Sequence, residues 1–364
     1  MAGARGLCDS FKAGVSFLIT PSLGSLSDTV GRKPVMYGPS LSDLIQRIIV
    51  LPFMSVPAEI VADSFFGSSS GACMSSTRAA LSDMYVHDPA ELGAWQSRLQ
   101  MGSTACTMVT PILASWLASK SLRLPLLVSA VLCVLNLLLI KASAGETLPP
   151  SKRKPWVWRS SSPLSVLQLF RNGQRLAWLS AMMTLDYFVQ PVLGGHNGIL
   201  QVFQADRLGW GLMQRGRFES FSSIVSLPAF LSAPALIHRL GLLNTARLGI
   251  VSTTLNLVLN TVARSSWHYF VAVLVGSMSK GGTQALTALI ASEGATVGLG
   301  QGEIQGMIWN LRSVVGMGSG LFWGGVFAFG TRRGIPALIF VVATVASLVQ
   351  LQFGQRLGSV KKSA

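Results

Sequence analysis

Charged residues are scarce in this sequence. Asp, Glu, Lys and Arg make up 12% of its 364 residues, hydrophobic residues make up 50%, and the mean hydropathy is +0.50. A typical soluble domain carries about 25% charged residues. Long apolar stretches recur from end to end, and no segment between them has the character of an independent soluble domain. The composition argues against a water-soluble enzyme and predicts a membrane protein.

The sequence also lacks the motifs that mark several enzymes. It contains no HExxH zinc pattern and no P-loop, which disfavours an enzyme embedded in the membrane and direct coupling to ATP. The four cysteines, Cys8, Cys73, Cys106 and Cys133, lie far apart, with neither a CxxC pair nor a histidine at metal-ligand spacing. We therefore expect no metal site and no cofactor.

Positive charge exceeds negative charge, with 29 Lys and Arg residues, 14 Asp and Glu residues and a formal net charge of +15. No nucleic-acid recognition motif accompanies this surplus. The basic residues lie mainly in every second connection between apolar stretches, which is the positive-inside distribution. These connections contain Arg32 and Lys33; Lys152, Arg153, Lys154 and Arg159; Arg239 and Arg247; and Arg356, Lys361 and Lys362. The exceptions, which lie in the other connections, are Lys120, Arg123, Arg264, Arg332 and Arg333. We expect the chain to contact membrane lipid and not nucleic acid.

Apolar windows near the roughly 20 residues needed to cross a bilayer predict an all-α polytopic membrane protein with about eleven transmembrane helices. Residues 1–142 are expected to form an N-terminal bundle, 143–173 a cytoplasmic linker, and 174–364 a C-terminal bundle with a short cytoplasmic tail. The five spans of the first bundle are 10–27, 34–53, 58–81, 95–118 and 122–141. The six spans of the second are 175–199, 218–238, 245–263, 267–291, 305–329 and 334–354.

The linker carries Pro149, Pro150 and the basic cluster from Lys152 to Arg159. This cluster could bind anionic lipid headgroups. A solvated cytoplasmic loop that fixes the orientation of the chain is the simpler interpretation.

A motif lies between the first two spans, in the stretch GSLSDTVGRK from Gly24 to Lys33. Gly24 allows close helix contact, Gly31 permits a tight turn, and Arg32 and Lys33 hold the loop in the cytosol. Asp28, at a helix end, can pair with cationic side chains or cap the N-terminus of a neighbouring helix, which would form a latch between the bundles. The same residues could instead only set the topology.

These ten residues resemble the major facilitator superfamily signature G-x-L-x-D-x-x-G-R-[KR], found between that family's second and third helices. Weaker similarity covers the rest of the chain and indicates the tetracycline-resistance-like branch of drug:proton antiporters. It is carried by Ala80 to Asp83, by Glu146 to Pro149, and by Gly302 to Gly306 with Asn310 to Ser313. The resemblance implies a secondary transporter that moves a small organic solute by alternating access, with protons or another ion as the coupling partner.

The chain departs from that family in three respects. It begins at what corresponds to the family's second helix, so the first helix is expected to be missing. Where relatives carry an arginine four residues before a glycine, this chain has Asp63 and Gly67, and the glycine-rich motif of the family's fifth helix is reduced to Gly102, Thr110 and Pro111. These departures leave open the alternative of a truncated or degenerate relative that does not transport.

Ionisable side chains within spans are costly and usually face a bundle interior, which makes them candidates for substrate binding or coupling. Asp186 and Gln190 share one helix face, and Lys280 and Gln284 repeat that spacing in a later span. Lys280 needs a partner if it is buried, which Asp186 or Asp63 could supply. Asp63 also lies four residues after Glu59, so the two carboxylates could share a proton, unless Glu59 lies in the outer interface of the membrane instead. Asn310, from the family-like stretch, completes the set.

Overall fold

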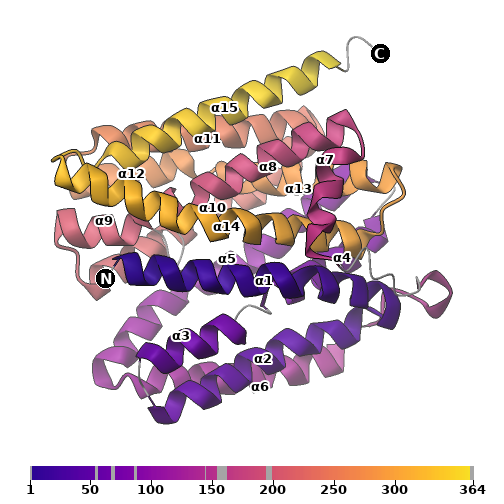
Figure 1. Cartoon of the computed structure of the whole chain (residues 1–364), viewed down its shortest axis with the longest axis horizontal. Coiled ribbons are helices and arrows are strands. Elements are labelled where there is room, and N and C mark those ends of the chain that lie inside the picture. Colours follow the sequence, from indigo (N-terminus) through magenta and orange to yellow (C-terminus); the bar gives the residue numbers. More distant parts are fainter. Residues whose placement is uncertain are drawn as a thin grey trace.

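The computed structural model describes residues 2–53, 56–66, 70–85, 88–143, 145–153, 162–193 and 199–360. Every regular element in these ranges is a helix, so the predicted all-α fold class is confirmed. The long helices run roughly along the longest axis of the molecule (Figure 1).

The described residues of the N-terminal half form six helices that match the five predicted spans. They are α1 (Ala2–Val30), α2 (Arg32–Phe53), α3 (Val56–Phe65), α4 (Ser70–Tyr85), α5 (Pro89–Lys120) and α6 (Arg123–Ser143). Gly31 separates α1 from α2 with φ of 117°, a conformation that a side chain would disfavour. Asp88 begins α5, because its carboxylate accepts hydrogen bonds from the backbone N–H groups of Ala90 and Glu91. The third predicted span, 58–81, is divided between α3 and α4.

The C-terminal half follows three short elements, η2 (Pro150–Lys152), η3 (Pro163–Leu167) and α7 (Gln168–Arg171). Its helices are α8 (Gln174–Leu193), α9 (Ile199–Leu208), α10 (Leu212–Leu240), α11 (Leu242–Val262), α12 (Ser266–Gly276), α13 (Ser279–Thr296), α14 (Gln301–Arg332) and α15 (Leu338–Val360). The predicted span 267–291 is interrupted between α12 and α13. The short helix α9 was not predicted.

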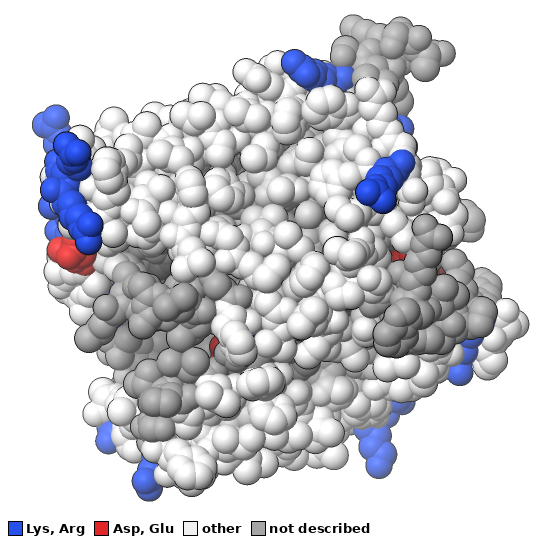
Figure 2. Space-filling model, viewed as in Figure 1, with Lys and Arg blue, Asp and Glu red and all other residues white. Residues whose placement is uncertain are grey.

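In the part of the chain that the structure describes, five helices are long and apolar enough to cross a membrane by length and composition: α6, α10, α11, α14 and α15. The helices α3, α4 and α12 have 10, 16 and 11 residues and are too short to cross alone. On the face shown in Figure 2, Lys and Arg lie at the margins and a broad central surface carries neither. This distribution suits a body embedded in lipid between two charged rims.

The two halves meet mainly along two helix pairs, α1 with α14 and α5 with α10, with further contacts of α4 with α14 and of α5 with α13. In Figure 1, α1 and α14 run side by side, with α2, α3 and α6 on one side of them and α8, α11 and α15 on the other. Gly24 of α1 lies against the backbone of α14, since a Cβ atom there would be 3.0 Å from the Gly302 carbonyl oxygen and 3.1 Å from the Gly306 Cα. Small residues allow this close approach of backbones within a membrane.

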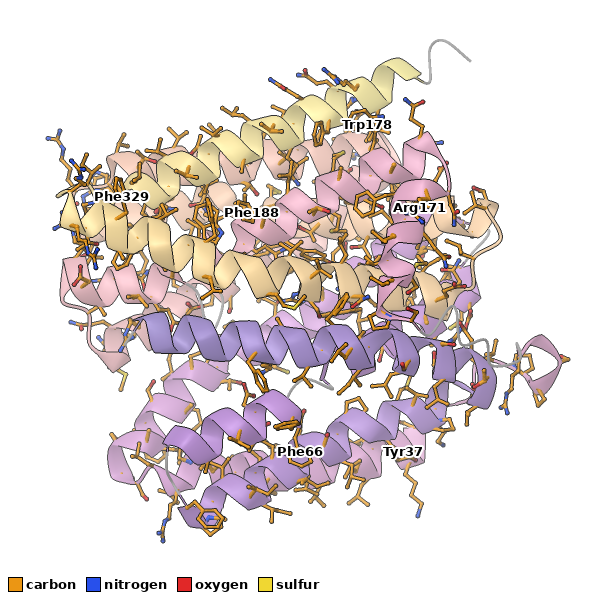
Figure 3. All side chains as sticks on the ribbon, viewed as in Figure 1. Tyr37, Phe66, Arg171, Trp178, Phe188 and Phe329 are labelled. Atoms are coloured by element: carbon orange, nitrogen blue, oxygen red, sulfur yellow. The ribbon has the colours of Figure 1, made fainter. Side chains whose placement is uncertain are left out.

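Aromatic side chains pack the C-terminal half at both ends of α8. Figure 3 labels Phe188 on α8, whose ring centroid lies 4.9 Å from that of Trp323 on α14. Trp178, near the start of α8, lies 5.0 Å from Phe353 on α15. In the linker, Leu169 of α7 is fully buried in the core against which Trp178 and Phe353 pack. The second part of the linker is therefore a packed element, although the apolar signal in the sequence stops there.

Candidate functional site

A cavity of about 380 Å³ lies between the two halves. This volume is within the usual range for small-molecule sites. The N-terminal half contributes side chains from α4 and α5, and the C-terminal half contributes side chains from α8 and from α10 to α14. Among the lining residues are Arg78, Gln100, Thr104, Thr107, Asp186, Tyr187, Gln190, Glu219, Ser222, Ser223, Ser226, Thr253, Asn256, Ser277, Lys280, Thr283, Gln284, Trp309 and Arg312.

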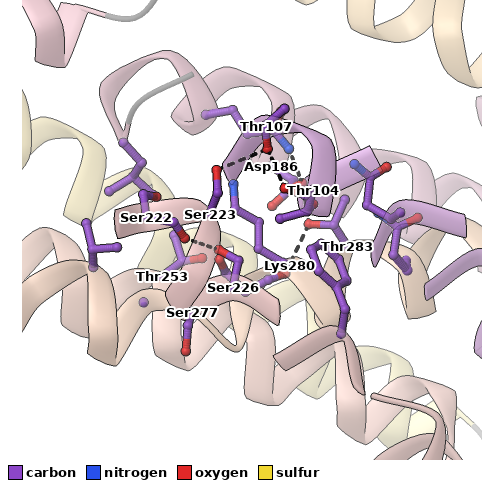
Figure 4. A pocket seen from close by; sticks show the side chains of 18 of the residues that line it. Thr104, Thr107, Asp186, Ser222, Ser223, Ser226, Thr253, Ser277, Lys280 and Thr283 are labelled. Carbon is purple, nitrogen blue, oxygen red and sulfur yellow. Dashed lines mark hydrogen bonds between the residues drawn. The ribbon is translucent and has the colours of Figure 1, made fainter. Parts of the chain in front are cut away.

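Hydrogen bonds organise one side of this cavity (Figure 4). The Asp186 carboxylate on α8 accepts a hydrogen bond from the Thr283 hydroxyl on α13 at 3.1 Å and another from the Gln190 amide at 3.0 Å. The hydroxyls of Thr107 on α5 and Ser223 on α10 lie 3.0 Å apart and join the two halves directly. Hydroxyl and amide groups can therefore contact a polar solute from both halves.

Cationic side chains and an indole also line the cavity. The guanidinium carbon of Arg312 lies 4.9 Å from the Trp309 ring centroid, and that of Arg78 lies 5.9 Å from the same centroid. Arg78 is only 8% exposed, and its Nη2 donates to the Gln100 side chain at 3.5 Å. Arg78 belongs to α4, whereas Trp309 and Arg312 belong to α14. This cluster thus also spans the two halves.

Four of the candidate residues from the sequence line the cavity: Asp186, Gln190, Lys280 and Gln284. Within the described residues, no ion pair within 4 Å joins Lys280 to Asp186 or to Asp63. The Asp63 carboxylate lies elsewhere, 2.9 Å from Lys12 Nζ and 3.0 Å from Gln46 Nε2. Asn310 is fully buried and donates to the carbonyl of Pro163 in the linker at 2.6 Å. The side chain of Glu59 lies outside the described part of the chain.

Sequence reasoning missed three charged residues of the cavity: Arg78, Glu219 and Arg312. All three lie within predicted spans, so the rule that ionisable side chains in spans mark functional sites applied to them as well. Applied at every position, that rule would have found them.

The motif residues build a charged cluster where α1 meets the start of α14. Arg32 is 1% exposed, and its guanidinium lies 2.7 Å from the carboxylate of Asp28 and 2.9 Å from that of Asp83. The other oxygen of Asp28 accepts the backbone N–H of Glu303 at 3.1 Å. A carboxylate from α1 therefore caps the N-terminus of α14, where the helix dipole favours negative charge.

Glu146 of the linker binds the backbone of the motif at Arg32 and Lys33. Its carboxylate accepts the backbone N–H groups of Arg32 at 2.9 Å, Lys33 at 3.3 Å and Leu148 at 3.0 Å. Burial acts to raise the pKa of the Glu146 carboxyl, but these hydrogen bonds and the charge of Arg153 outweigh it and lower the pKa below the usual value. The Lys33 ammonium donates to the carbonyl of Lys141 at 3.2 Å. Within the described ranges, no group of three or more His, Cys, Asp or Glu side chains could hold a metal ion.

Comparison with known proteins gives consistent results. A family model described as the Major Facilitator Superfamily matches residues 6–317. Hippocampus abundant transcript-like protein 1 of Homo sapiens is 26% identical in an alignment 335 residues long that covers 87% of this chain and 62% of that protein. The class C tetracycline resistance protein of Escherichia coli is 26% identical over 336 residues, covering 90% of this chain and 81% of the relative. The chain thus spans less than two thirds of the length of the first relative.

Solved structures show the same fold at lower identity. The human organic anion transporter MFSD10 (TETRAN) matches with a TM-score of 0.81 and 20% identity, covering 96% of this chain and 83% of that one. A bacterial homologue of the iron transporter ferroportin, in an outward-facing state with soaked iron, matches with a TM-score of 0.70 and 17% identity, covering 96% and 89%.

Proposed function

The chain belongs to the Major Facilitator Superfamily, and we propose on this premise that it is a secondary active transporter that moves a small organic solute by alternating access. Membership of the family and the fold of its solved relatives also make it an integral, multi-pass membrane protein and not an enzyme. The resemblance drawn from Gly24 to Lys33 is thereby confirmed at the level of the family.

The cavity between the halves carries the proposal. It is polar, it is large enough for a small organic molecule, and both halves contribute to its walls. In transporters built from repeated bundles, the solute binds between the bundles and access alternates when one bundle rocks against the other. A solute that contacts both walls can bias that motion, because its affinity differs between the two arrangements.

The cluster around Asp28 is the proposed latch of this motion. The hydrogen bond from Glu303 to Asp28 and the close approach of Gly24 to Gly302 hold α1 against α14. The ion pair with Arg32 holds the Asp28 carboxylate in place. We assign Gly24, Asp28, Gly31, Arg32 and Lys33 to this gating role. The latch must open when access changes sides.

Asp186 is the residue we propose for ion coupling. It lies in the cavity within hydrogen-bonding distance of Thr283 and Gln190, and Lys280 lines the same space. A carboxylate in a polar cavity can exchange a proton or bind a cation, which would link solute movement to an ion gradient.

The test is a search for flux with the full chain in proteoliposomes. Vesicles are loaded with a small-molecule extract of cells, and mass spectrometry follows which compounds leave them, with no gradient and with a pH gradient in either direction. We expect at least one solute to leave faster than from protein-free vesicles, and Asp186→Asn to remove the effect of the pH gradient because it abolishes the titratable group.

The control for this test is Asp206→Asn, since Asp206 is an exposed carboxylate on α9 away from the cavity lining. It should leave both the flux and its response to the gradient unchanged. If a folded protein moves no component of the extract under any gradient, the transport proposal is wrong.

A further inference from the structure

Positively charged side chains outnumber negatively charged ones in the lining of the cavity. Three cationic residues, Arg78, Lys280 and Arg312, line it against two acidic residues, Asp186 and Glu219. An unpaired charge removed from bulk water is costly, so a surplus cation in such a space favours the binding of an anion.

Arg78 shows this imbalance most clearly. Arg78 and Arg32 are both buried, with exposed fractions of 8% and 1%. Arg32 lies between two carboxylates, whereas Arg78 has none within ion-pair distance in the described chain. The Nε–H of Arg78 is buried and has no acceptor among the described residues. The Arg78 guanidinium contacts the Gln100 amide oxygen and the face of the Trp309 ring. Among the described residues, the charge of this guanidinium therefore has no counter-ion.

Two further donors lie beside Arg78. The indole Nε1–H of Trp309 is also buried without an acceptor in the described structure. Arg312 lies over the Trp309 ring and 6.0 Å from the Tyr187 ring centroid, and it forms no ion pair with any described carboxylate. Unsatisfied donors of both kinds, guanidinium and indole, are the groups that a carboxylate oxygen accepts from.

We propose that the cavity selects a small organic anion, whose carboxylate is held by Arg78 and Arg312 and whose body lies toward the hydroxyl-lined side; this inference rests on the proposed function of the cavity. Arg78 comes from the N-terminal half and Arg312 from the C-terminal half. The anion therefore neutralises two like charges that face each other across the boundary and joins the halves when it binds. An empty cavity keeps that repulsion, which resists closure around the site.

The experiment uses two sets of molecules that keep their shape while their charge changes. Acetate, acetamide and acetamidine form one set, and benzoate, benzamide and benzamidine form the other. Binding is measured at neutral pH on the purified full chain as the rise in its thermal unfolding midpoint with ligand concentration. We expect the carboxylate of at least one set to bind about tenfold or more tightly than its amide and its amidine, because charge-assisted hydrogen bonds are about twice as strong as neutral ones.

Substitutions then assign the effect to the two arginines. Arg312→Gln and Arg78→Gln should each weaken binding of the carboxylate about tenfold and leave binding of the amide unchanged. Arg312 is exposed to the cavity, so its variant remains informative if Arg78→Gln fails to fold. Arg98→Gln is the matched control, since Arg98 also stacks on a tryptophan, 4.5 Å from the Trp95 ring centroid, but outside the cavity.

The possible outcomes separate this inference from the transport proposal. If neither carboxylate binds more tightly than its amide and amidine, or if the preference survives both arginine variants, the anion site is wrong even where flux of another solute is found. If the preference depends on the arginines but the protein carries no solute, the anion site stands and transport fails.

Discussion

At the scale of single residues, Gly24 allows the backbones of α1 and α14 to approach closely. A Cβ atom there would lie 3.0 Å and 3.1 Å from backbone atoms of Gly302 and Gly306, which cannot move as a side chain can. We therefore expect Gly24→Val to separate the helices and to destabilise the protein by about 1–3 kcal/mol. The measurement is the thermal unfolding midpoint of the purified chain.

Gly38→Val is the control for this prediction. Gly38 also lies within a long helix, α2, but nothing approaches the position of its Cβ within 4 Å. Because both substitutions have the same intrinsic effect on a helix, the difference between the unfolding midpoints of the two variants reports the contact with α14. Equal stability of the two variants would contradict the role given to Gly24.

Arg78 and Asp63 show what the sequence could predict about the cavity. Both are ionisable and both lie in the predicted span 58–81, so the cost of charge in a membrane marks them equally. The structure places Asp63 against Lys12 and Gln46, whereas Arg78 lines the cavity beside Trp309. That difference depends on the division of the span into α3 and α4 and on contact with α14, more than 200 residues away. Hydropathy does not encode either feature.

At the scale of elements, Glu146, which belongs to the linker, caps the N-terminus of α2. It accepts the N–H groups of Arg32 and Lys33 at the first turn of that helix. Loss of a capping residue costs about 0.5–2 kcal/mol. We expect Glu146→Gln to lower the unfolding midpoint at neutral pH, because the amide keeps one acceptor but loses the charge.

The same contact predicts a pH dependence. Since the native pKa of Glu146 is lowered, its contribution is complete above the usual carboxyl pKa and is lost as the pH falls through the lower native value. The difference in unfolding midpoint between the original protein and Glu146→Gln should thus hold from neutral pH to about pH 5 and shrink below about pH 4. The variant Asp206→Asn, at an exposed carboxylate, should show no such difference. A difference that stays constant to low pH would contradict the ionised cap.

Most elements could be predicted from the sequence because a bilayer demands long apolar stretches. All eleven predicted spans correspond to helices or to adjoining pairs of helices. The interruption between α12 and α13 was not predicted, because Gly276 at the end of α12 does not stand out in a chain whose long helices contain many glycines, such as Gly316 within α14. The short helices η3, α7 and α9 were missed as well, because their burial depends on tertiary packing, as the fully buried Leu169 illustrates.

At the scale of the whole molecule, the boundary between the halves combines tight and open regions. Glycine contacts and the Asp28 cluster close it along α1 and α14, and the polar cavity opens it between α5 and the C-terminal helices. The sequence motif indicated the first region, but only folding brings the scattered polar residues of the second together. The division into bundles at residues 143–173 stays a prediction.

A cross-link between α5 and α10 tests whether the halves must move relative to each other. The hydroxyls of Thr107 and Ser223 lie 3.0 Å apart, which suits a disulfide if both residues become cysteine, since bridged Cβ atoms lie about 3.5–4.5 Å apart. Thr107→Cys and Ser223→Cys are combined after replacement of Cys8, Cys73, Cys106 and Cys133 by serine.

Oxidation of this double variant should abolish solute flux, because a covalent bond between the halves prevents rocking, and a reductant should restore the flux. The reduced double variant and each single variant under oxidant are the controls for the substitutions themselves. Undiminished flux through fully cross-linked protein, with the extent of cross-linking established by mass spectrometry, would show that transport does not require movement between α5 and α10.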